Sequence, residues 1–337
     1  MLKQIKDFLH PTYLDIKDKF FAPKDFEADT LPWIDRSKAN INEGLKGFEP
    51  IAGELSYDMA EKLSFWQKNG YVILEKAIST NLIDNYLTDV EHLLKDNKKF
   101  NTVVRIDLPK FQPNAERKAK DWTGGDLREK FVKINDFHSI SKAGKELMSH
   151  PAIGNFLWAV FQQQPVAFQS LTFLYGSQQP THQDFAWVRS NIASHLVASW
   201  IALEDVKIDS GPLYYYVGSH KIPKYNFGNG ILYSGRSTKT PLEFADYLDK
   251  TCTDLNLPKE NLIIKKGDVL LWHAALTHGG NAIENPEQTR KSMVCHYSTK
   301  TSYPYHRLAN GVAPVVQNHN GLLIYGDPNN LSQENML

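Results

Sequence analysis

From residue 165 onward the chain is a series of short apolar runs separated by turns, and this pattern restricts the fold more than any other feature. The runs are VAFQSLTFLYG, SHLVASWIAL, LYYYVG, NLIIKKGDVLLWHAAL and RKSMVCHYST. Gly176, Gly211-Pro212, Gly218 and Gly267-Asp268 bound them, as turn residues bound strands. Many strands joined by tight turns and longer loops predict a sandwich or jelly roll rather than a parallel sheet.

Helical patterns precede these strands. SYDMAEKLSFWQKNG predicts a helix that ends at Gly70, and YVIL (71–74) predicts a short strand. Ser79 is a suitable N-cap for a helix whose apolar side chains recur at helical spacing, and further helices are expected near 141–149 and 151–162. The predicted class is therefore mostly β, with packed helices and a helical N-terminal region.

The chain has no internal repeat and no low-complexity linker, which favours one elaborated domain over residues 56–337. Residues 1–55 contain four prolines that interrupt any long helix, and we expect an N-terminal extension that serves as a lid or a dimer arm. Residues 100–130 are irregular and basic, which is typical of a solvated loop or of a loop that covers a substrate.

The overall charge argues against a nucleic acid or an anionic membrane as partner, because Lys+Arg and Asp+Glu both number 38. The two cysteines give no disulfide framework, and the charged N-terminus has no apolar signal segment. The longest apolar runs, such as LVASWIAL (196–203), are too short to span a bilayer. We expect a cytoplasmic protein that acts on a small molecule, as a monomer or a homodimer.

The stretch THQDFAW contains the first candidate for chemistry. His182 and Asp184 are two residues apart, so in extended backbone both side chains point to one side and are within reach of one cation. A third ligand is available in WHAALTHGGN, where Gly279-Gly280 after His278 lets the backbone turn closely around a site. Two histidines and one carboxylate suit non-haem Fe(II).

Two other histidines compete for this role. His273 shares strand parity with Val269 and Leu271, so it is expected in the core or behind the ligands. His195 begins a strand and is expected to be structural.

A possible receptor for a carboxylate follows twelve residues after His278. On a strand, Arg290, Ser292, Val294 and His296 project to one face. A buried guanidinium binds a carboxylate bidentately, and a neighbouring hydroxyl adds a further donor. The HxD pair, a distant histidine and a downstream RxS together are much harder to obtain by chance than any one of them.

These motifs, in this order, resemble the phytanoyl-CoA dioxygenase (PhyH) family of Fe(II)/2-oxoglutarate-dependent oxygenases. The resemblance runs from about residue 60 to 300 and rests on FWQKNGYVILEKAIS, THQD, SGPLYYYVGSHKIP, KKGDVLLWHAALTHGGN and the arginine of TRKS. It implies a double-stranded β-helix, a jelly-roll (cupin-like) core with helices packed on one side. Residues 1–55 and 221–262 are outside the resemblance.

The resemblance also implies a set of cofactors and site residues. Fe(II) would be held by His182, Asp184 and His278, and 2-oxoglutarate and O2 would be the co-substrates. Arg290, with Ser292, would hold the distal carboxylate of 2-oxoglutarate. A polar residue of the strand before THQD often faces the co-substrate in this family, and the candidates here are Gln169, Thr172 and Tyr175.

The expected reaction is hydroxylation of an unactivated C–H bond in a small polar or acidic metabolite, with release of succinate and CO2. The candidate substrate contacts are Trp187, His296 and Arg105. Further cations that could bind an anionic substrate are Lys224, Arg236 and Lys239. Asp184 argues against halogenation, because related halogenases replace this carboxylate with a small residue. Desaturation, ring closure and epimerisation stay open.

Two alternatives remain open. A cupin-like jelly roll could hold another metal and work as an isomerase or hydrolase, but it would not need Arg290 and Ser292. A catalytically silent jelly roll would bind a ligand or partner, but it would not need the intact set of metal ligands.

Overall fold

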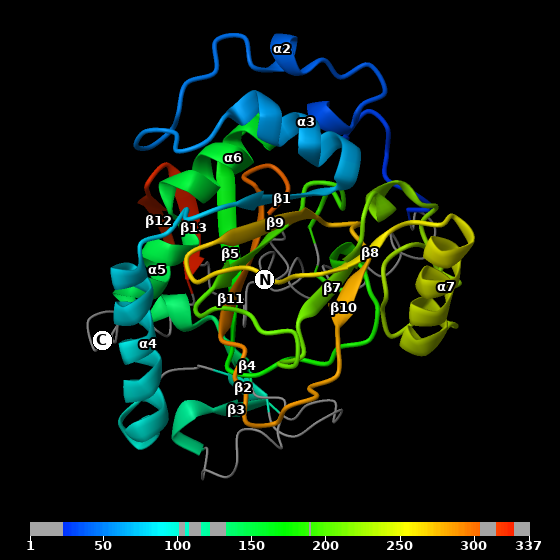
Figure 1. The fold of residues 1–337 in the computed structure, drawn as a ribbon. Helices are drawn as coiled ribbons and strands as arrows, with labels where there is room; N and C mark the ends of the chain where they lie inside the picture. Colours follow the sequence, from blue (N-terminus) through cyan, green and yellow to red (C-terminus); the bar gives the residue numbers. More distant parts are fainter. Residues whose placement is uncertain are drawn as a thin grey trace, which may run out of the picture.

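The computed structural model describes residues 23–100, 105–107, 116–121, 133–188, 190–303 and 315–326, and they form two facing β-sheets with helices on one side (Figure 1). The large sheet has the strand order β1-β9-β6-β11-β5-β4-β2-β3, and the β12-β13 hairpin joins it through β5. The small sheet has the order β10-β7-β8. This arrangement confirms the predicted jelly-roll class.

The strands of the large sheet are β1 (Tyr71–Leu74), β2 (Arg105–Asp107), β3 (Glu116–Lys118), β4 (Lys133–Asn135), β5 (Pro165–Phe173), β6 (Val197–Ala202), β9 (Val269–His273), β11 (Ser292–Thr299), β12 (Val315–His319) and β13 (Leu322–Gly326). Those of the small sheet are β7 (Leu213–Tyr216), β8 (Lys259–Asn261) and β10 (His278–Gly280). β11 pairs antiparallel with both β5 and β6, so it lies in the middle of the large sheet.

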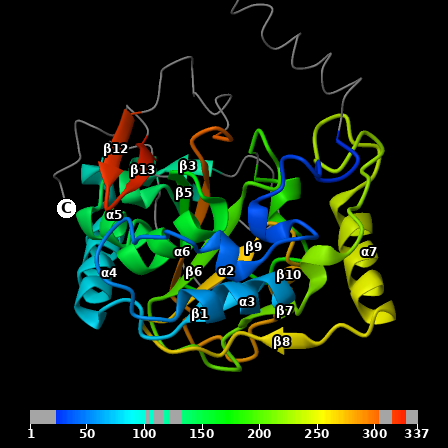
Figure 2. The ribbon, with the colours of Figure 1, turned by 90° about the horizontal axis from the view of Figure 1, so that it is seen from above.

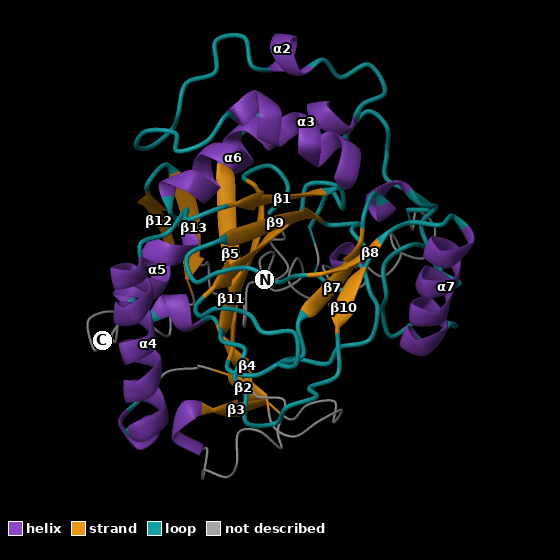
Figure 3. Cartoon of the chain, viewed as in Figure 1, coloured by secondary structure: helices purple, strands orange, loops and turns teal. Residues whose placement is uncertain are grey.

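The helices are α2 (Ile41–Gly44), α3 (Met59–Asn69), α4 (Thr80–Lys95), α5 (Lys142–Met148), α6 (Pro151–Phe161) and α7 (Pro241–Asp254). Gly70 ends α3 in the left-handed conformation, and the Ser79 side chain caps α4, as the sequence predicts. Figure 3 shows α3 to α6 grouped around the large sheet, while α7 lies apart beside the small sheet.

The hydrophobic core is divided by the large sheet. One cluster fills the space between the sheet and helices α3 to α6, and it includes Leu63, Trp66, Tyr86, Phe156 and Tyr297. A second hydrophobic cluster lies between the two sheets, and a third cluster packs under α7. Helices therefore seal one face of the large sheet, whereas its other face is left to the small sheet and to the site.

Strand β7 shows how alternation works when both faces are covered. Tyr214 and Tyr216 pack under α7, whereas Tyr215 faces the core between the sheets. The three side chains alternate as expected, yet all three are buried.

Residues 221–262, which lie outside the family resemblance, contain α7, and Thr240 and Glu243 form a capping box at its start. The expectation that NLIIKKGDVLLWHAAL is one strand was wrong: only Asn261 belongs to β8, and a turn that ends at Asp268 separates it from β9. The irregular stretch 100–130 contains β2 and β3, and most of the expected covering loop lies outside the described residues.

Residues 23–55, the described part of the expected N-terminal extension, pack against the helical face and the end of β9 (Figure 2). Trp33 Nε1 donates to the carbonyl of Ala159 at 2.8 Å, and Asn155 Oδ1 accepts a hydrogen bond from the backbone N–H of Ile51. Within the described ranges, no helix has the length and apolar character needed to cross a membrane.

Candidate metal centre and adjoining pocket

Two short segments bring the three predicted ligands together. The residues around His182 form an isolated bridge with β10, in which the backbone N–H and C=O of His182 both pair with those of His278. A single 3₁₀ turn, Asp184–Ala186, then begins at Asp184 and directs its carboxylate back toward the two rings. The ligand atoms of all three residues lie within 4.8 Å of one another.

Both imidazoles are presented in the tautomer that a metal requires. His182 Nδ1 lies 2.8 Å from the carbonyl of Pro180, and His278 Nδ1 lies 2.9 Å from that of Leu276. A carbonyl only accepts, so each Nδ1 carries the proton and each Nε2 keeps its lone pair. These Nε2 atoms lie 3.6 and 3.7 Å from Asp184 Oδ1, a spacing compatible with ligands about 2.1 Å from one ion.

Electrostatics favours the same protonation states. Burial, with His278 as a second cause, lowers the pKa of His182 to about 4, so its ring is neutral near pH 7. Burial alone would raise the pKa of Asp184, but the surrounding histidines outweigh it and hold that pKa well below its usual range. The Asp184 carboxylate and the neutral imidazole of His182 are therefore ready for a divalent cation.

The other carboxylate oxygen of Asp184, Oδ2, contacts side chains outside the set of three candidate ligands. Trp272 Nε1 donates to Asp184 Oδ2 at 2.8 Å, and His296 Nε2 lies 3.7 Å from the same atom. Oδ2 is thereby engaged, and Oδ1 is left facing the histidines. Neither ring nitrogen of His296 has a hydrogen-bond partner among the described residues, although the side chain is buried.

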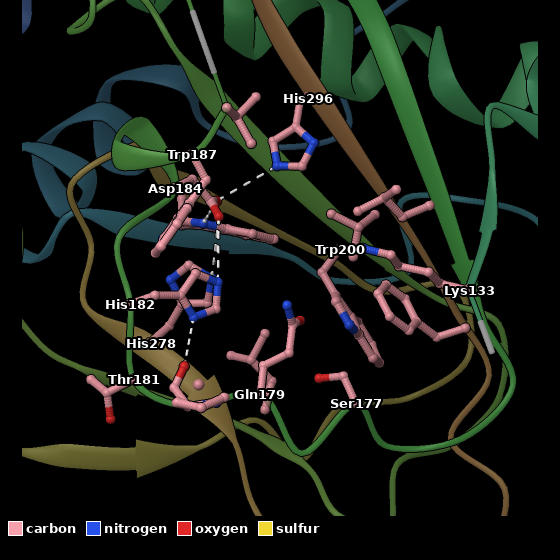
Figure 4. A pocket seen from close by; sticks show the side chains of 18 of the residues that line it. Lys133, Ser177, Gln179, Thr181, His182, Asp184, Trp187, Trp200, His278 and His296 are labelled. Atoms are coloured by element: carbon pink, nitrogen blue, oxygen red, sulfur yellow. Dashed lines mark hydrogen bonds and ion pairs between the residues drawn. The ribbon is translucent and has the colours of Figure 1, made fainter. Parts of the chain in front are cut away.

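The three candidate ligands form one wall of a pocket of about 560 Å³ between the two sheets. Figure 4 shows His296, Asp184, His182 and His278 along this wall, with Trp200 and Lys133 on the opposite side. The remaining lining residues include Asn135, Gln169, Leu171, Phe173, Ser177, Gln179, Trp187, Val188, Leu213, Pro241, Leu242, Trp272, Arg290 and Val294.

Arg290 is a buried cation in this pocket. It is 2% exposed, and its Nη1 donates to the carbonyl of Gly211 at 2.9 Å. Its guanidinium carbon lies 5.7 Å from the centre of the Trp200 ring, and its Nε has no hydrogen-bond partner among the described residues. No carboxylate in the described part of the chain pairs with it, and burial lowers the pKa of Arg290 to about 10. An anionic ligand is the group that this end of the pocket lacks.

Most of the predicted pocket residues lie where the sequence places them. Val294 and His296 line the pocket from one face of β11, Arg290 lines it from just before that strand, and Gln169 and Trp187 also line it. Ser292 has the same parity but is fully buried and absent from the pocket lining, and its Oγ has no hydrogen-bond partner among the described residues.

Besides Ser292, two further candidates for a co-substrate contact, Tyr175 and Thr172, are absent from the pocket lining. Tyr175 packs against the helix-side core and is absent from the pocket lining, because it follows the end of β5. Thr172 faces the same core, where its hydroxyl contacts that of Tyr86. Arg105 lies in β2, and its side chain is outside the described residues.

The basic insert does not supply the cations that the sequence suggested for an anionic substrate. Lys224 donates to the carbonyls of His220 and Ile222, and Lys239 lies over the Tyr225 ring. Neither these two residues nor Arg236 line the pocket. From this region, α7 contributes Pro241 and the 67% exposed Leu242, so the rim here is apolar.

Sequence reasoning also missed the contribution of β4. Lys133 and Asn135 line the pocket, and no motif marked them. The alternation in KIN (133–135) was the only signal, since residues i and i+2 of a strand share a face.

His273 and His195 are structural, as expected. His273 Nδ1 accepts the N–H of Ala275, so its Nε2 carries the proton and faces Asp35 Oδ2 at 3.4 Å. His195 bridges the Thr299 hydroxyl and the carbonyl of Thr30. Both histidines thus tie residues 23–55 to the sheet.

Comparison with known proteins agrees with this geometry. The model of the phytanoyl-CoA dioxygenase (PhyH) family matches residues 66–292. The peroxisomal phytanoyl-CoA dioxygenase of Mus musculus is 22% identical over 259 residues, which cover 71% of this chain and 68% of that protein. A probable phytanoyl-CoA dioxygenase of Caenorhabditis elegans is 23% identical over 269 residues, covering 75% and 79%.

Solved structures share the fold. The epimerase SnoN, in complex with Fe3+, alpha ketoglutarate and nogalamycin RO, superposes with a TM-score of 0.55 at 18% identity, covering 79% of this chain and 98% of SnoN. EctD from S. alaskensis, with 2-oxoglutarate and 5-hydroxyectoine, gives 0.54 at 17% identity, covering 75% and 82%. With its HxD and distal histidine in ligand geometry, the chain belongs to the phytanoyl-CoA dioxygenase family of Fe(II)/2-oxoglutarate-dependent oxygenases.

Proposed function

We propose that this protein is a dioxygenase that uses Fe(II) and 2-oxoglutarate to hydroxylate an unactivated C–H bond of a small polar metabolite. The observation that carries the proposal is the combination, in one pocket, of the three candidate ligands with a buried arginine that lacks an anionic partner. A metal isomerase or hydrolase would have no use for such an arginine.

The residues present fit the metal and the co-substrate. His182, Asp184 and His278 would hold Fe(II), which suits two imidazoles and one carboxylate. When bound, Fe(II) with 2-oxoglutarate supplies the oxidising chemistry: one oxygen atom of O2 enters the substrate C–H bond, and the other enters succinate as CO2 is released.

Arg290 would bind the distal carboxylate of 2-oxoglutarate. Its unpartnered Nε and the unpartnered hydroxyl of Ser292 are donors for that carboxylate. Apolar side chains of Phe173, Trp200 and Leu213 share this end of the pocket, so the charge pair would be shielded from water and correspondingly strong. Gln169 lines the same pocket and would donate a further hydrogen bond.

His296 and Trp187 would orient the substrate. His296 lies beside Asp184, with its Nε2 3.7 Å from Asp184 Oδ2, and its Nδ1 has no hydrogen-bond partner among the described residues, so the ring suits a polar substrate group near the metal. Trp187 packs 4.6 Å from Tyr233, centre to centre, so its ring is held as a firm wall. The pocket volume of about 560 Å³ is within the usual range for small-molecule sites, and 2-oxoglutarate would fill only part of it.

The test is Fe(II)-dependent succinate formation from 2-oxoglutarate under air, beside anaerobic titration of the Fe(II) protein with 2-oxoglutarate. Wild type should form succinate slowly even without its substrate and develop the visible absorption band of the Fe(II)–2-oxoglutarate chelate. His182→Ala should lose both signals, whereas Arg290→Ala should still bind metal but require far more 2-oxoglutarate. Wild type that shows neither signal would contradict the proposal.

A further inference from the structure

A largely buried hydrogen-bond network adjoins the candidate metal ligands, on the side away from Asp184. The Thr181 hydroxyl lies 2.9 and 2.8 Å from the two carboxylate oxygens of Asp249, which belongs to α7. It also lies 2.6 Å from the Tyr214 hydroxyl, and the Tyr216 hydroxyl lies 3.0 Å from Asp249 Oδ1. Figure 4 shows Thr181 beside His182 and His278.

The proton directions in this network follow from its chemistry. The Asp249 carboxylate only accepts, so the single Thr181 proton goes to it, and Tyr214 must then donate to Thr181. Burial raises the pKa of Tyr214 and of Tyr216, which keeps both hydroxyls protonated as donors. The chain of donors therefore runs from Tyr214 to Thr181 to Asp249, with Tyr216 as a second, separate donor.

The network contacts the segments of both histidine ligands. Thr181 immediately precedes His182, and its side chain is 3% exposed, so fixing it fixes the peptide that carries His182. Tyr214 pairs across the small sheet with Gly279, the residue after His278. A Cβ at Gly279 would lie 2.5 Å from the Tyr214 hydroxyl, so this glycine lets the hydroxyl approach the strand that carries His278.

We propose that Asp249 is a positioning residue for the metal centre, acting through the Thr181 hydroxyl on the turn that carries His182. The inference rests on the proposed function, because it assumes that His182 is a metal ligand. It means that α7, which supplies no ligand, contributes to metal affinity. The same helix contributes Pro241 and Leu242 to the pocket, so one element supports the ligand turn and forms part of the substrate wall.

The network offers variants that separate positioning from general stability. Thr181→Val keeps the shape of the side chain and removes its hydroxyl, and Asp249→Asn removes the charge of the acceptor. Thr181→Ser is the conservative variant, because serine keeps the hydroxyl. Tyr216→Phe is the matched control, because it removes the other donor to Asp249 and leaves Thr181 untouched.

The measurement is the affinity for Co(II), followed by calorimetry and by the visible Co(II) spectrum, with the melting temperature of each metal-free variant. Loss of a group that orients a ligand typically weakens metal binding by about 10- to 100-fold. We expect such a loss, with an altered Co(II) spectrum, for Thr181→Val and Asp249→Asn. Thr181→Ser and Tyr216→Phe should stay within about twofold of wild type, even where Tyr216→Phe lowers the melting temperature.

Two results would overturn the inference while leaving the proposed function intact. One is wild-type affinity in Thr181→Val, and the other is an equal loss of affinity in Tyr216→Phe, which would indicate general loosening. Wild type that binds no Co(II) through His182, as judged against His182→Ala, would overturn both the inference and the proposed function.

Discussion

Replacing Arg290 by methionine should leave the ligand-free protein at least as stable as wild type, although Arg290 is almost fully buried. The guanidinium has one hydrogen bond, to the carbonyl of Gly211, and a stacking contact with Trp200. Methionine has a similar length, carries no charge and fits the apolar neighbours Phe173, Leu213 and Val294.

The expected change in the free energy of unfolding is the balance of opposing contributions. Burial lowers the pKa of Arg290 to about 10, and because this is below its ordinary value, the charged form that exists at pH 7 is destabilised, by roughly 3 kcal/mol. The hydrogen bond of the charged guanidinium stabilises the folded state by about 1.5 kcal/mol, and the cation–π contact stabilises it by about 0.5 to 1 kcal/mol. The free energy of unfolding of Arg290→Met should therefore be equal to that of wild type, or higher by about 1 kcal/mol.

The assay is urea unfolding of both proteins with Mn(II) in place of Fe(II), with and without 2-oxoglutarate. Ligand at one hundred times its Kd should stabilise wild type by about 2.7 kcal/mol and should leave Arg290→Met unchanged. Arg290→Lys serves as the control that keeps the charge but loses the planar fork, and it should show a reduced ligand effect. A loss of about 3 kcal/mol or more in ligand-free Arg290→Met would refute the reasoning, since the guanidinium would then be satisfied by the fold itself.

Three further predictions concern other parts of the site and its surroundings. Burial lowers the pKa of His220 to about 2, below its unfolded value of 6.5, so the folded protein loses stability as the pH falls below about 6.5. The variant His220→Gln should recover roughly 2 kcal/mol of this loss at pH 5, as measured by urea unfolding. Trp272→Phe removes the donor to Asp184 Oδ2 and should weaken Co(II) binding by about 10- to 100-fold in calorimetry, and unchanged affinity would contradict that role. Leu242→Asp, at an exposed position of the pocket rim, should leave the melting temperature and substrate-free succinate formation unchanged but lower turnover of a substrate found by screening.

The candidate metal ligands could be picked out from the sequence because their signals are local. His182 and Asp184 are two residues apart, and the even spacing of Arg290 and His296 predicts that both face the same pocket without knowledge of the sheet order. The register that joins His182 to His278 is not local, yet the choice between His278 and His273 could be made from strand parity alone.

The groups that surround the ligands could not be predicted in the same way, because their roles depend on which strands become neighbours. Lys133 reaches the pocket only because β4 pairs with β5. Trp272 donates to Asp184 because β9 lies opposite the ligand turn, and its sequence position suggests only a core residue. Tyr175 shows the opposite error: it is near the ligand turn in sequence, but it packs on the helical face of the sheet.

α7 illustrates how a missed element alters the functional reading. The motif TPLE (240–243) is a capping box with proline at the first helical position, so the start of the helix was visible in the sequence. The basic residues of 221–240, just before this helix, suggested cationic contacts for an anionic substrate, but Lys224, Arg236 and Lys239 do not line the pocket. With α7 in place, the same region supplies an apolar rim through Leu242 and a carboxylate to Thr181 through Asp249. A substrate group that meets α7 should therefore be apolar, while its polar groups should lie deeper, toward His296.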